Sequence, residues 1–219
     1  MGRSDSKIAV VIPCYNEQAT LAAVVTGAVP FGDVFVIDDG STDASVQIAH
    51  DAGAQVVPTA GRTGYDGAIE AGLRHAHAQG YDFIITIDAD GEHDPKLVRN
   101  LADAYRDGAQ LVIGIRPAPQ RLAEWIVCGY CRHAFGVNDV LCGMKGFARP
   151  VLDAYFADAH PNLVNTWPAL LWAATHDVTQ INVTGTPRTD QPRYSSRMRA
   201  NMQIIKLLAP FRALRKRTR

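Results

Sequence analysis

The sequence lacks an apolar run long enough to cross a bilayer, and it lacks the leader of a secreted protein. Its longest apolar candidate, residues 163–174, is interrupted by Pro168 and is shorter than the about 18 residues that a membrane-spanning helix needs. No basic stretch followed by a short apolar segment opens the chain, so a signal peptide is not predicted. We therefore expect a cytoplasmic protein, either free or held peripherally at the cytoplasmic face of a membrane.

Cysteine is scarce, and the four cysteines do not form a recognisable metal or redox site. Cys128 and Cys131 have the spacing of a redox motif, but no thioredoxin-like strand precedes them. No second close pair of Cys or His joins Cys14 or Cys142 to complete a tetrahedral zinc set. Because Cys often serves as a small core residue, we expect buried or half-buried thiols in a reducing setting.

Acidic residues are nearly absent from the C-terminal segment, residues 188–219. This segment holds 10 Lys or Arg and a single acid, Asp190, whereas residues 1–187 hold 12 Lys or Arg and 21 Asp or Glu. Apolar residues alternate with cations from Met198 onward, which predicts a basic amphipathic helix. Such a segment either meets an anionic partner such as a membrane surface or packs on the acidic body. We expect no nucleic-acid partner, and the sequence is compatible with a homo-oligomer.

Short β-branched apolar runs alternate with helical segments along the first half of the chain. The length suits one domain, and 47% hydrophobic with 20% charged residues excludes a disordered chain. Strands are predicted at residues 8–12, 34–37, 55–57, 83–87 and 111–115, and helices between them at 17–29, 43–52, 65–79 and 95–107. Later elements are predicted less regularly, as helices at 122–135, 150–156, 167–175 and 198–214 and strands at 144–147 and 180–183. This alternation predicts an α/β fold with a mostly parallel sheet covered by helices.

Polar and acidic residues follow three of these strands at the point where each strand ends. The segments 13–17, 38–43 and 88–90 supply Asp, Glu or turn residues, and the last reads Asp88-Ala-Asp90. Ligands bind beyond the carboxyl ends of strands in such sheets, so we expect these segments to lie together. Clustered carboxylates repel one another unless a cation offsets them. A hard divalent ion, shared with substrate phosphates, is the simplest explanation.

The three segments read Val11-Ile-Pro-Cys-Tyr-Asn-Glu17, Val36-Ile-Asp-Asp-Gly-Ser-Thr-Asp43 and Ile87-Asp-Ala-Asp-Gly-Glu-His-Asp-Pro95. In order and spacing they resemble the motifs of family 2 glycosyltransferases with the GT-A fold. Within that family the chain looks most like the polyprenyl-phosphate (dolichol-phosphate-type) hexosyltransferase branch. The resemblance implies one GT-A domain over residues 1–187, with a nucleotide-binding part near 7–116, an acceptor part near 117–187, and the basic segment 188–219 after it.

The resemblance also implies where a UDP- or GDP-sugar donor binds. A glycine-bearing loop, Arg62-Thr-Gly-Tyr-Asp-Gly-Ala68, would line the nucleotide pocket together with the ends of the first strands. Asp90 would be the chief ligand of Mg²⁺ or Mn²⁺ on the diphosphate, with Asp88 and Glu92 beside it, and His93 stays open as a ligand or a plain loop residue. The implied nucleotide-binding residues are Pro13, Tyr15, Glu17, Asp38, Asp39, Arg62, Gly64 and Asp88.

Further residues resemble the family's catalytic and acceptor positions. Arg116 and Arg121 resemble basic residues that meet the diphosphate and the acceptor phosphate. Asp139 opens a stretch, residues 139–147, similar to the family's D-x-x-x-G-x-x-x-F segment under the acceptor, and a purely structural role for it stays open. Arg193, or Arg188, resembles a late arginine that precedes a serine segment.

The implied reaction is an inverting transfer in which the metal and arginines stabilise the diphosphate leaving group. A hydroxyl acceptor needs a general base, whereas a phosphate acceptor is already anionic. Many family members carry a late acidic base, but residues 163–172 contain no carboxylate. This absence favours a polyprenyl-phosphate acceptor over a saccharide hydroxyl in surface-glycan assembly.

Two other classes remain as alternatives to a glycosyltransferase. A sugar nucleotidyltransferase shares the layered sheet, but it needs a G-x-G-x-R loop after the first strand, where this chain has Pro13-Cys-Tyr-Asn16. A nucleotide-sugar-binding module that has lost catalysis is compatible with the missing base.

Overall fold

The computed structural model describes residues 6–119, 121–158, 161, 163–183 and 197–218. Within these residues the centre is a seven-stranded sheet with the order β3-β2-β1-β4-β6-β5-β7. All neighbouring strands pair in parallel except β6, which is antiparallel to both β4 and β5. The strands are β1 Ile8–Cys14, β2 Asp33–Asp38, β3 Gln55–Pro58, β4 Phe83–Thr86, β5 Leu111–Ile115, β6 Lys145–Ala148 and β7 Thr179–Asn182.

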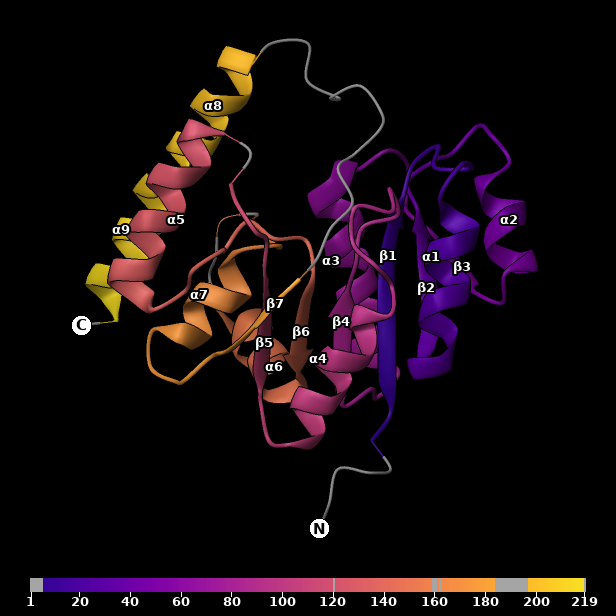
Figure 1. Cartoon of the computed structure of the whole chain (residues 1–219), viewed down its shortest axis with the longest axis horizontal. Helices are drawn as coiled ribbons and strands as arrows, with labels where there is room; N and C mark the ends of the chain where they lie inside the picture. The colour runs from indigo at the N-terminus through magenta and orange to yellow at the C-terminus, as the bar shows by residue number, and fades with distance from the viewer. Residues whose placement is uncertain (1–5, 120, 159–160, 162, 184–196, 219) are drawn as a thin grey trace.

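Helices connect and cover these strands, as Figure 1 shows. The expected mostly parallel α/β sheet is confirmed. Helix α3 packs on β1, β2 and β4, and α4 packs on β4, β5 and β6. None of the described helices is long and apolar enough to cross a bilayer. The helices are α1 Leu21–Ala28, the 3₁₀ turn η2 Val29–Phe31, α2 Ser45–Asp51, α3 Gly64–Ala78, α4 Leu97–Arg106, α5 Leu122–Phe135, α6 Arg149–Ala157, α7 Trp167–Ala173, α8 Arg197–Lys206 and α9 Leu208–Arg217.

The core lies on both sides of the central strands. Every residue of β1 and of β4 is buried, which is the pattern of parallel strands covered by helices on both faces. The edge strands β3 and β7 are only partly buried. All four cysteines are free thiols and buried, so the expectation of plain core cysteines is confirmed.

The order of strands in the sheet places β1 between β2 and β4. Cys14 of β1 pairs with Asp38 of β2, and Val11 of β1 pairs with Thr86 of β4. Because the three strands run in parallel, the segments that follow them leave the sheet at one edge. The predicted meeting of these three segments is therefore confirmed. The insertion of β6 between β4 and β5 was not predicted, since its short sequence carries no sign of its partners.

The C-terminal segment forms two helices, where the sequence predicted one over 198–214. The break falls between Lys206 of α8 and Leu208 of α9. Pro210 explains it, because proline has no N–H to donate and its ring clashes with the carbonyl four residues earlier, here that of Lys206. Proline is tolerated in the first turn of a new helix, which is where α9 places it. Both helices pack on α5, and Phe211 and Leu214 of α9 are buried there.

Gly72 sets how closely α3 approaches the strands that carry the candidate site. A Cβ at this position would collide with Val11 of β1 and would lie 2.9 Å from Cγ1 of Ile37 in β2. We expect Gly72→Ala to lower the free energy of unfolding by about 1–3 kcal/mol, because both neighbours are packed core side chains. Urea denaturation monitored by circular dichroism measures this change.

Gly129→Ala is the matched control, because a Cβ at Gly129 in α5 would have no neighbour within 4 Å. Alanine there should raise stability by up to about 1 kcal/mol through its better helix propensity. Equal stability of the two variants would show that α3 has room to move away from the sheet.

Candidate functional site

The candidate site is a small hollow at the carboxyl edge of β1 and β4. It measures about 160 Å³. The backbone N–H of Ile87 donates to the carbonyl of Val11 at 3.2 Å, which holds the end of β4 beside β1 and directs the next residues over the edge. The residues that line the hollow are Pro13, Glu17, Tyr65, Asp88, Ala89, Asp90 and Glu92.

Asp88 is held firmly in this hollow. The hydroxyl of Tyr65 donates to Oδ1 of Asp88 at 2.8 Å, and the carboxylate lies so close to Gly143 that any Cβ there would collide with it. The segment of Gly143 is itself anchored, because the Thr86 hydroxyl donates to the Gly143 carbonyl at 2.8 Å. Burial and the nearby charge of Asp90 raise the pKa of Asp88. A cation beside Asp88 would therefore favour its ionised form.

The residues of the hollow fit a divalent ion shared with a diphosphate. No group of three or more His, Cys, Asp or Glu within the described residues is arranged to hold a metal alone. Such a set is not required, because Mg²⁺ in nucleotide sites is usually bound by one or two carboxylates plus substrate phosphates. Asp88, Asp90 and Glu92 offer those oxygens. Buried His93 also has an Nδ1 atom without a hydrogen-bond partner among the described residues, while its Nε2 lies 3.8 Å from the Cys142 sulfur.

Asp39 organises the glycine-bearing loop. Its Oδ1 accepts from the Thr63 backbone N–H at 2.6 Å and from the Thr59 hydroxyl at 3.0 Å, and its Oδ2 accepts from the Gly64 N–H at 2.8 Å. Burial by itself would raise the pKa of Asp39, but these donors outweigh burial and lower it. Gly64 has a φ of +77°, a conformation that favours glycine. Both Asp39 oxygens are engaged by the loop, so its contact with a nucleoside stays a prediction.

The other residues predicted to bind nucleotide gather around the ends of β1 and β2. The Arg62 guanidinium lies over the Tyr15 ring, 3.9 Å from its centroid. Asp38 accepts from the Ser41 backbone N–H at 3.0 Å, and the Glu17 N–H donates to the Ser45 hydroxyl at 2.9 Å. The Glu17–Ser45 bond, together with the bond from the Asn16 N–H to the Ser41 hydroxyl at 3.0 Å, joins the segment after β1 to the chain that follows β2. The structure thus brings the predicted nucleotide residues together, while their roles stay predictions.

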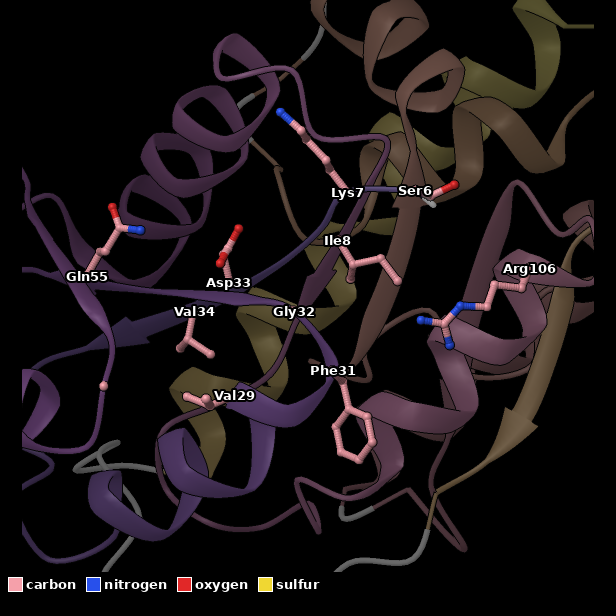
Figure 2. Close-up of a pocket in the computed structure, with 11 residues that line it drawn as sticks. Ser6, Lys7, Ile8, Val29, Phe31, Gly32, Asp33, Val34, Gln55 and Arg106 are labelled. Atoms are coloured by element: carbon pink, nitrogen blue, oxygen red, sulfur yellow. The ribbon is translucent and has the colours of Figure 1, made fainter. Parts of the chain in front are cut away.

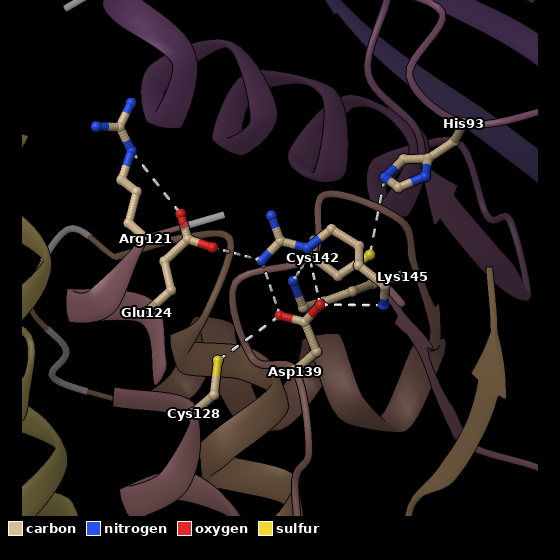
Figure 3. Close-up of polar contacts among 8 residues, drawn as sticks. His93, Arg121, Glu124, Cys128, Asp139, Cys142 and Lys145 are labelled. Atoms are coloured by element: carbon tan, nitrogen blue, oxygen red, sulfur yellow. Dashed lines mark hydrogen bonds and ion pairs between the residues drawn. The ribbon is translucent and has the colours of Figure 1, made fainter. Parts of the chain in front are cut away.

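Arg116 belongs to a buried ion-pair network, of which Figure 3 labels the acidic members Asp139 and Glu124. Its Nε donates to Oδ2 of Asp139 at 2.8 Å, its Nη2 donates to Oδ1 at 3.0 Å, and the same Nη2 lies 3.3 Å from Glu124. The Arg116 side chain is only 13% exposed. Two carboxylates therefore neutralise the cation that the sequence assigned to phosphate. Asp139 keeps its charge because Arg116 outweighs the effect of burial and lowers the pKa of Asp139.

Arg121 lies at the start of this network and is more available. Its Nε is 4.0 Å from Glu124, and its side chain is 22% exposed. Glu124 was missed in the sequence, although it stands three residues after Arg121 at a spacing typical of helix ion pairs. Arg193 and Arg188 lie outside the described residues, so their predicted role is not placed.

Lys145 is a second buried residue that sequence analysis did not single out. Its ammonium donates to the Cys142 carbonyl and, at 3.1 Å, to Oδ1 of Asn165. Burial lowers the pKa of Lys145 to about 8. The only sequence signal was its place within the 139–147 stretch. Lys145 ties that stretch to the loop before α7.

A separate hollow of about 390 Å³ opens at the other end of the sheet, where β1 and β2 begin (Figure 2). Lys7, Asp33, Gln55 and Arg106 are among the residues around it. None of the predicted site residues lines it. Because ligands of such sheets bind beyond the carboxyl ends of the strands, the candidate site remains the edge that carries Asp88 and Asp90.

Comparison with known proteins identifies the family to which the chain belongs. The model of a family described as Glycosyl transferase family 2 matches residues 9–124, which is more than half of the chain. An undecaprenyl-phosphate mannosyltransferase of Micrococcus luteus is 32% identical over 173 residues, covering 70% of this chain and 71% of that protein. A polyprenol monophosphomannose synthase of Mycolicibacterium smegmatis is 28% identical over 172 residues, which cover 69% of this chain and 65% of that protein.

Solved structures share the fold at lower identity. The glucosyl-3-phosphoglycerate synthase of Mycobacterium tuberculosis, in complex with Mn²⁺, UDP and glucosyl-3-phosphoglycerate, matches with a TM-score of 0.73. The match covers 97% of this chain and 81% of that chain at 21% identity. The fold is therefore that of the GT-A glycosyltransferases, as the sequence motifs implied. The chain belongs to glycosyl transferase family 2 and is a glycosyltransferase that resembles the polyprenyl-phosphate hexosyltransferase branch of the family.

Proposed function

We propose that the protein transfers a sugar from a nucleotide-sugar donor to a polyprenyl phosphate with the help of Mg²⁺ or Mn²⁺. The observation that carries the proposal is the hollow in which Asp88, Asp90 and Glu92 meet beside the Asp39-held loop. The printed names of the Micrococcus and Mycolicibacterium relatives support a polyprenyl-phosphate acceptor. The neighbour solved with Mn²⁺ and UDP supports a metal-bound nucleoside diphosphate.

The nucleotide would bind along the ends of β1 and β2. Tyr15 and Arg62, stacked on each other, lie where a base or ribose could pack, and Asp38 stands at the end of β2. The loop that Asp39 holds brings Tyr65 against Asp88 and so closes one side of the hollow. Either UDP or GDP fits this description.

Asp90 would hold the metal, with Asp88 and Glu92 beside it. When bound, the ion would offset the charge that grows on the diphosphate as the sugar–phosphate bond breaks. Tyr65 and Gly143 keep the Asp88 carboxylate in one orientation. Such preorganised charge needs no rearrangement during the reaction, which is how electrostatic stabilisation accelerates transfer.

The acceptor side favours an anionic nucleophile. Residues 163–172 contain no carboxylate, and Asp139 is bound on both oxygens by Arg116. A phosphate acceptor attacks without a general base, so this arrangement suits it. Arg121 is the cation available to that phosphate, whereas Arg116 positions Asp139 at the end of β5.

The acceptor's lipid chain would lie in a bilayer, so the proposal includes contact with a membrane surface. The sequence placed this contact in the C-terminal segment, residues 188–219. In the structure Phe211 and Leu214 of α9 are buried on the protein, whereas Met202 and the cations Lys206, Arg212 and Lys216 are exposed. A homo-oligomer stays a prediction.

A nucleotide-sugar panel tests the proposed donor and acceptor together. UDP- and GDP-sugars are screened for thermal stabilisation with Mn²⁺ or Mg²⁺, and the best donor is then offered a short-chain polyprenyl phosphate or a saccharide. We expect nucleotide sugars of one base to raise the melting temperature of the protein, and the best of them to serve as donor for transfer to the polyprenyl phosphate. Transfer only to the saccharide would favour a hydroxyl acceptor, and binding without transfer or hydrolysis would indicate a binding module.

Asp90→Asn should abolish transfer while leaving folding almost unchanged. The substitution keeps the shape of the side chain and removes the charge that holds the ion, so a rate loss of at least about 100-fold is expected. Turnover at saturating Mn²⁺ and the melting temperature are measured together. Asp107→Asn, an exposed acid after α4, serves as the control, and near-normal turnover of Asp90→Asn would reject the assignment.

Asp39→Ala should weaken UDP or GDP binding about tenfold or more, with or without metal. The loop N–H groups of Thr63 and Gly64 would lose their charged acceptor, and a hydrogen bond to a charged group contributes about 1.5–3 kcal/mol. Asp38→Ala should weaken binding through lost contact with the nucleoside. Calorimetric titration of UDP or GDP with and without Mg²⁺ separates weaker nucleotide binding by either variant from weaker metal binding. Unchanged affinity in both variants would place the nucleoside elsewhere.

A further inference from the structure

Exposed large apolar side chains are concentrated on one side of the molecule. Among the described residues, the four most exposed are Leu122 at 74%, Trp125 at 60%, Met202 at 55% and Ile126 at 48%. Leu122, Trp125 and Ile126 belong to α5, and Met202 belongs to α8, which packs against α5. We call these four residues the α5 face.

The three α5 residues form one stripe of that helix. Their spacing of three and four residues places them on the same side of an α-helix. The opposite side of α5 is buried against the body through Val127, Cys128 and Cys131, among others. Helices α8 and α9 cover a further flank of α5. The stripe therefore stays apolar and open at the start of the helix, although the opposite side is packed.

The α5 face lies toward the acceptor side of the candidate site. In Figure 1 α8 and the start of α5 reach past the carboxyl ends of the parallel strands, the edge that carries Asp88 and Asp90. A hollow of about 350 Å³ has Trp125 and Gly129 of α5 on one wall and Arg116 and Asp139 on another. Trp125 of the apolar stripe and the buried ion-pair network thus border the same space.

The charge around this face is of one sign. Residues 197–218 carry seven Lys or Arg and no Asp or Glu. Lys206, Arg212 and Lys216 are exposed on α8 and α9. Two copies joined through the α5 face would bring these cations together, which opposes self-association. An anionic lipid surface complements them, and Trp with aliphatic neighbours is the composition that membrane interfaces favour.

We propose that the α5 face is a membrane-docking surface that inserts Leu122, Trp125, Ile126 and Met202 into the headgroup boundary of an anionic bilayer. The cations of α8 and α9 would meet the lipid headgroups around the inserted side chains. This extends the membrane contact expected of the C-terminal segment, where Met202 is exposed, to the start of α5. The inference rests on the proposed function only in its account of what docking achieves. Docking would bring a lipid-borne acceptor to the sheet edge that carries Asp90.

Vesicle binding by the full chain tests the surface without any need for catalysis. We expect co-sedimentation with vesicles of 7:3 phosphatidylcholine and phosphatidylglycerol at low salt, and little with pure phosphatidylcholine. Leu122→Ser/Ile126→Ser/Met202→Ser should lower the partition coefficient at least about tenfold, because apolar insertion adds to the electrostatic attraction. Val29→Ser, which removes an exposed apolar side chain far from this face, should bind as the wild type does.

The cations are tested in the same assay. Lys206→Glu/Arg212→Glu/Lys216→Glu should abolish binding to the anionic vesicles, while Lys96→Glu/Arg99→Glu on the exposed side of α4 should bind normally. Trp125 emission should shift to the blue on vesicles, and Trp125→Phe should remove that shift while binding persists. Melting temperatures confirm that each variant is folded.

Wild-type binding by the Leu122/Ile126/Met202 variant, or no binding by the wild type, would overturn the docking surface. A wild-type dimer that this variant converts to a monomer would also overturn it and assign the face to self-association. Transfer to a water-soluble short-chain prenyl phosphate should be unchanged in the variant, and transfer to a vesicle-borne acceptor should fall about tenfold. Vesicle binding without transfer to either acceptor would reject the proposed function and leave the docking surface intact.

Discussion

The repulsion between the carboxylates of Asp88 and Asp90 is the constraint on which the site depends. The parallel register of β2, β1 and β4 delivers acidic segments to one edge, and burial raises the pKa of Asp88 there. The protein offsets part of this cost with the Tyr65 hydroxyl and the nearby positive charge of Lys145. A divalent ion with diphosphate oxygens would supply the remaining positive charge.

A second electrostatic network stabilises the proposed acceptor side. Arg116 binds both oxygens of Asp139 and lies near Glu124, which joins the end of β5 to α5 and to the 139–147 stretch. Breaking such a buried pair from one side leaves an uncompensated charge, which costs about 3–5 kcal/mol. The network therefore fixes α5 relative to the sheet, and with it the exposed stripe on that helix. Site geometry and the proposed docking surface share this support.

Much of the fold and part of the site could be predicted from local sequence. Continuous apolar runs such as β1 and β4 indicated covered parallel strands, and the bounds predicted for α5 agree with the structure. The three polar segments at strand ends predicted where the acids would meet, because parallel strands leave the sheet at the same edge. The position of β6 could not be predicted in this way, since its two partner strands are set by contacts far along the chain.

Sequence by itself determined which residues carry charge and which stretches form most of the helices and strands, because these depend on residue type and short-range periodicity. It did not fix every end, since α1 begins at Leu21 and α9 begins as a separate helix at Leu208. Tertiary structure decided how the charges are paired. Arg116, assigned to phosphate on sequence, is neutralised by Asp139 and Glu124, and Asp39 is engaged by a loop from another part of the chain. Likewise, Phe211 of the amphipathic C-terminal segment is buried where α9 packs on α5, whereas Trp125 of α5 itself is exposed. Such outcomes depend on which surfaces meet after folding, and local sequence carries no record of those long-range contacts.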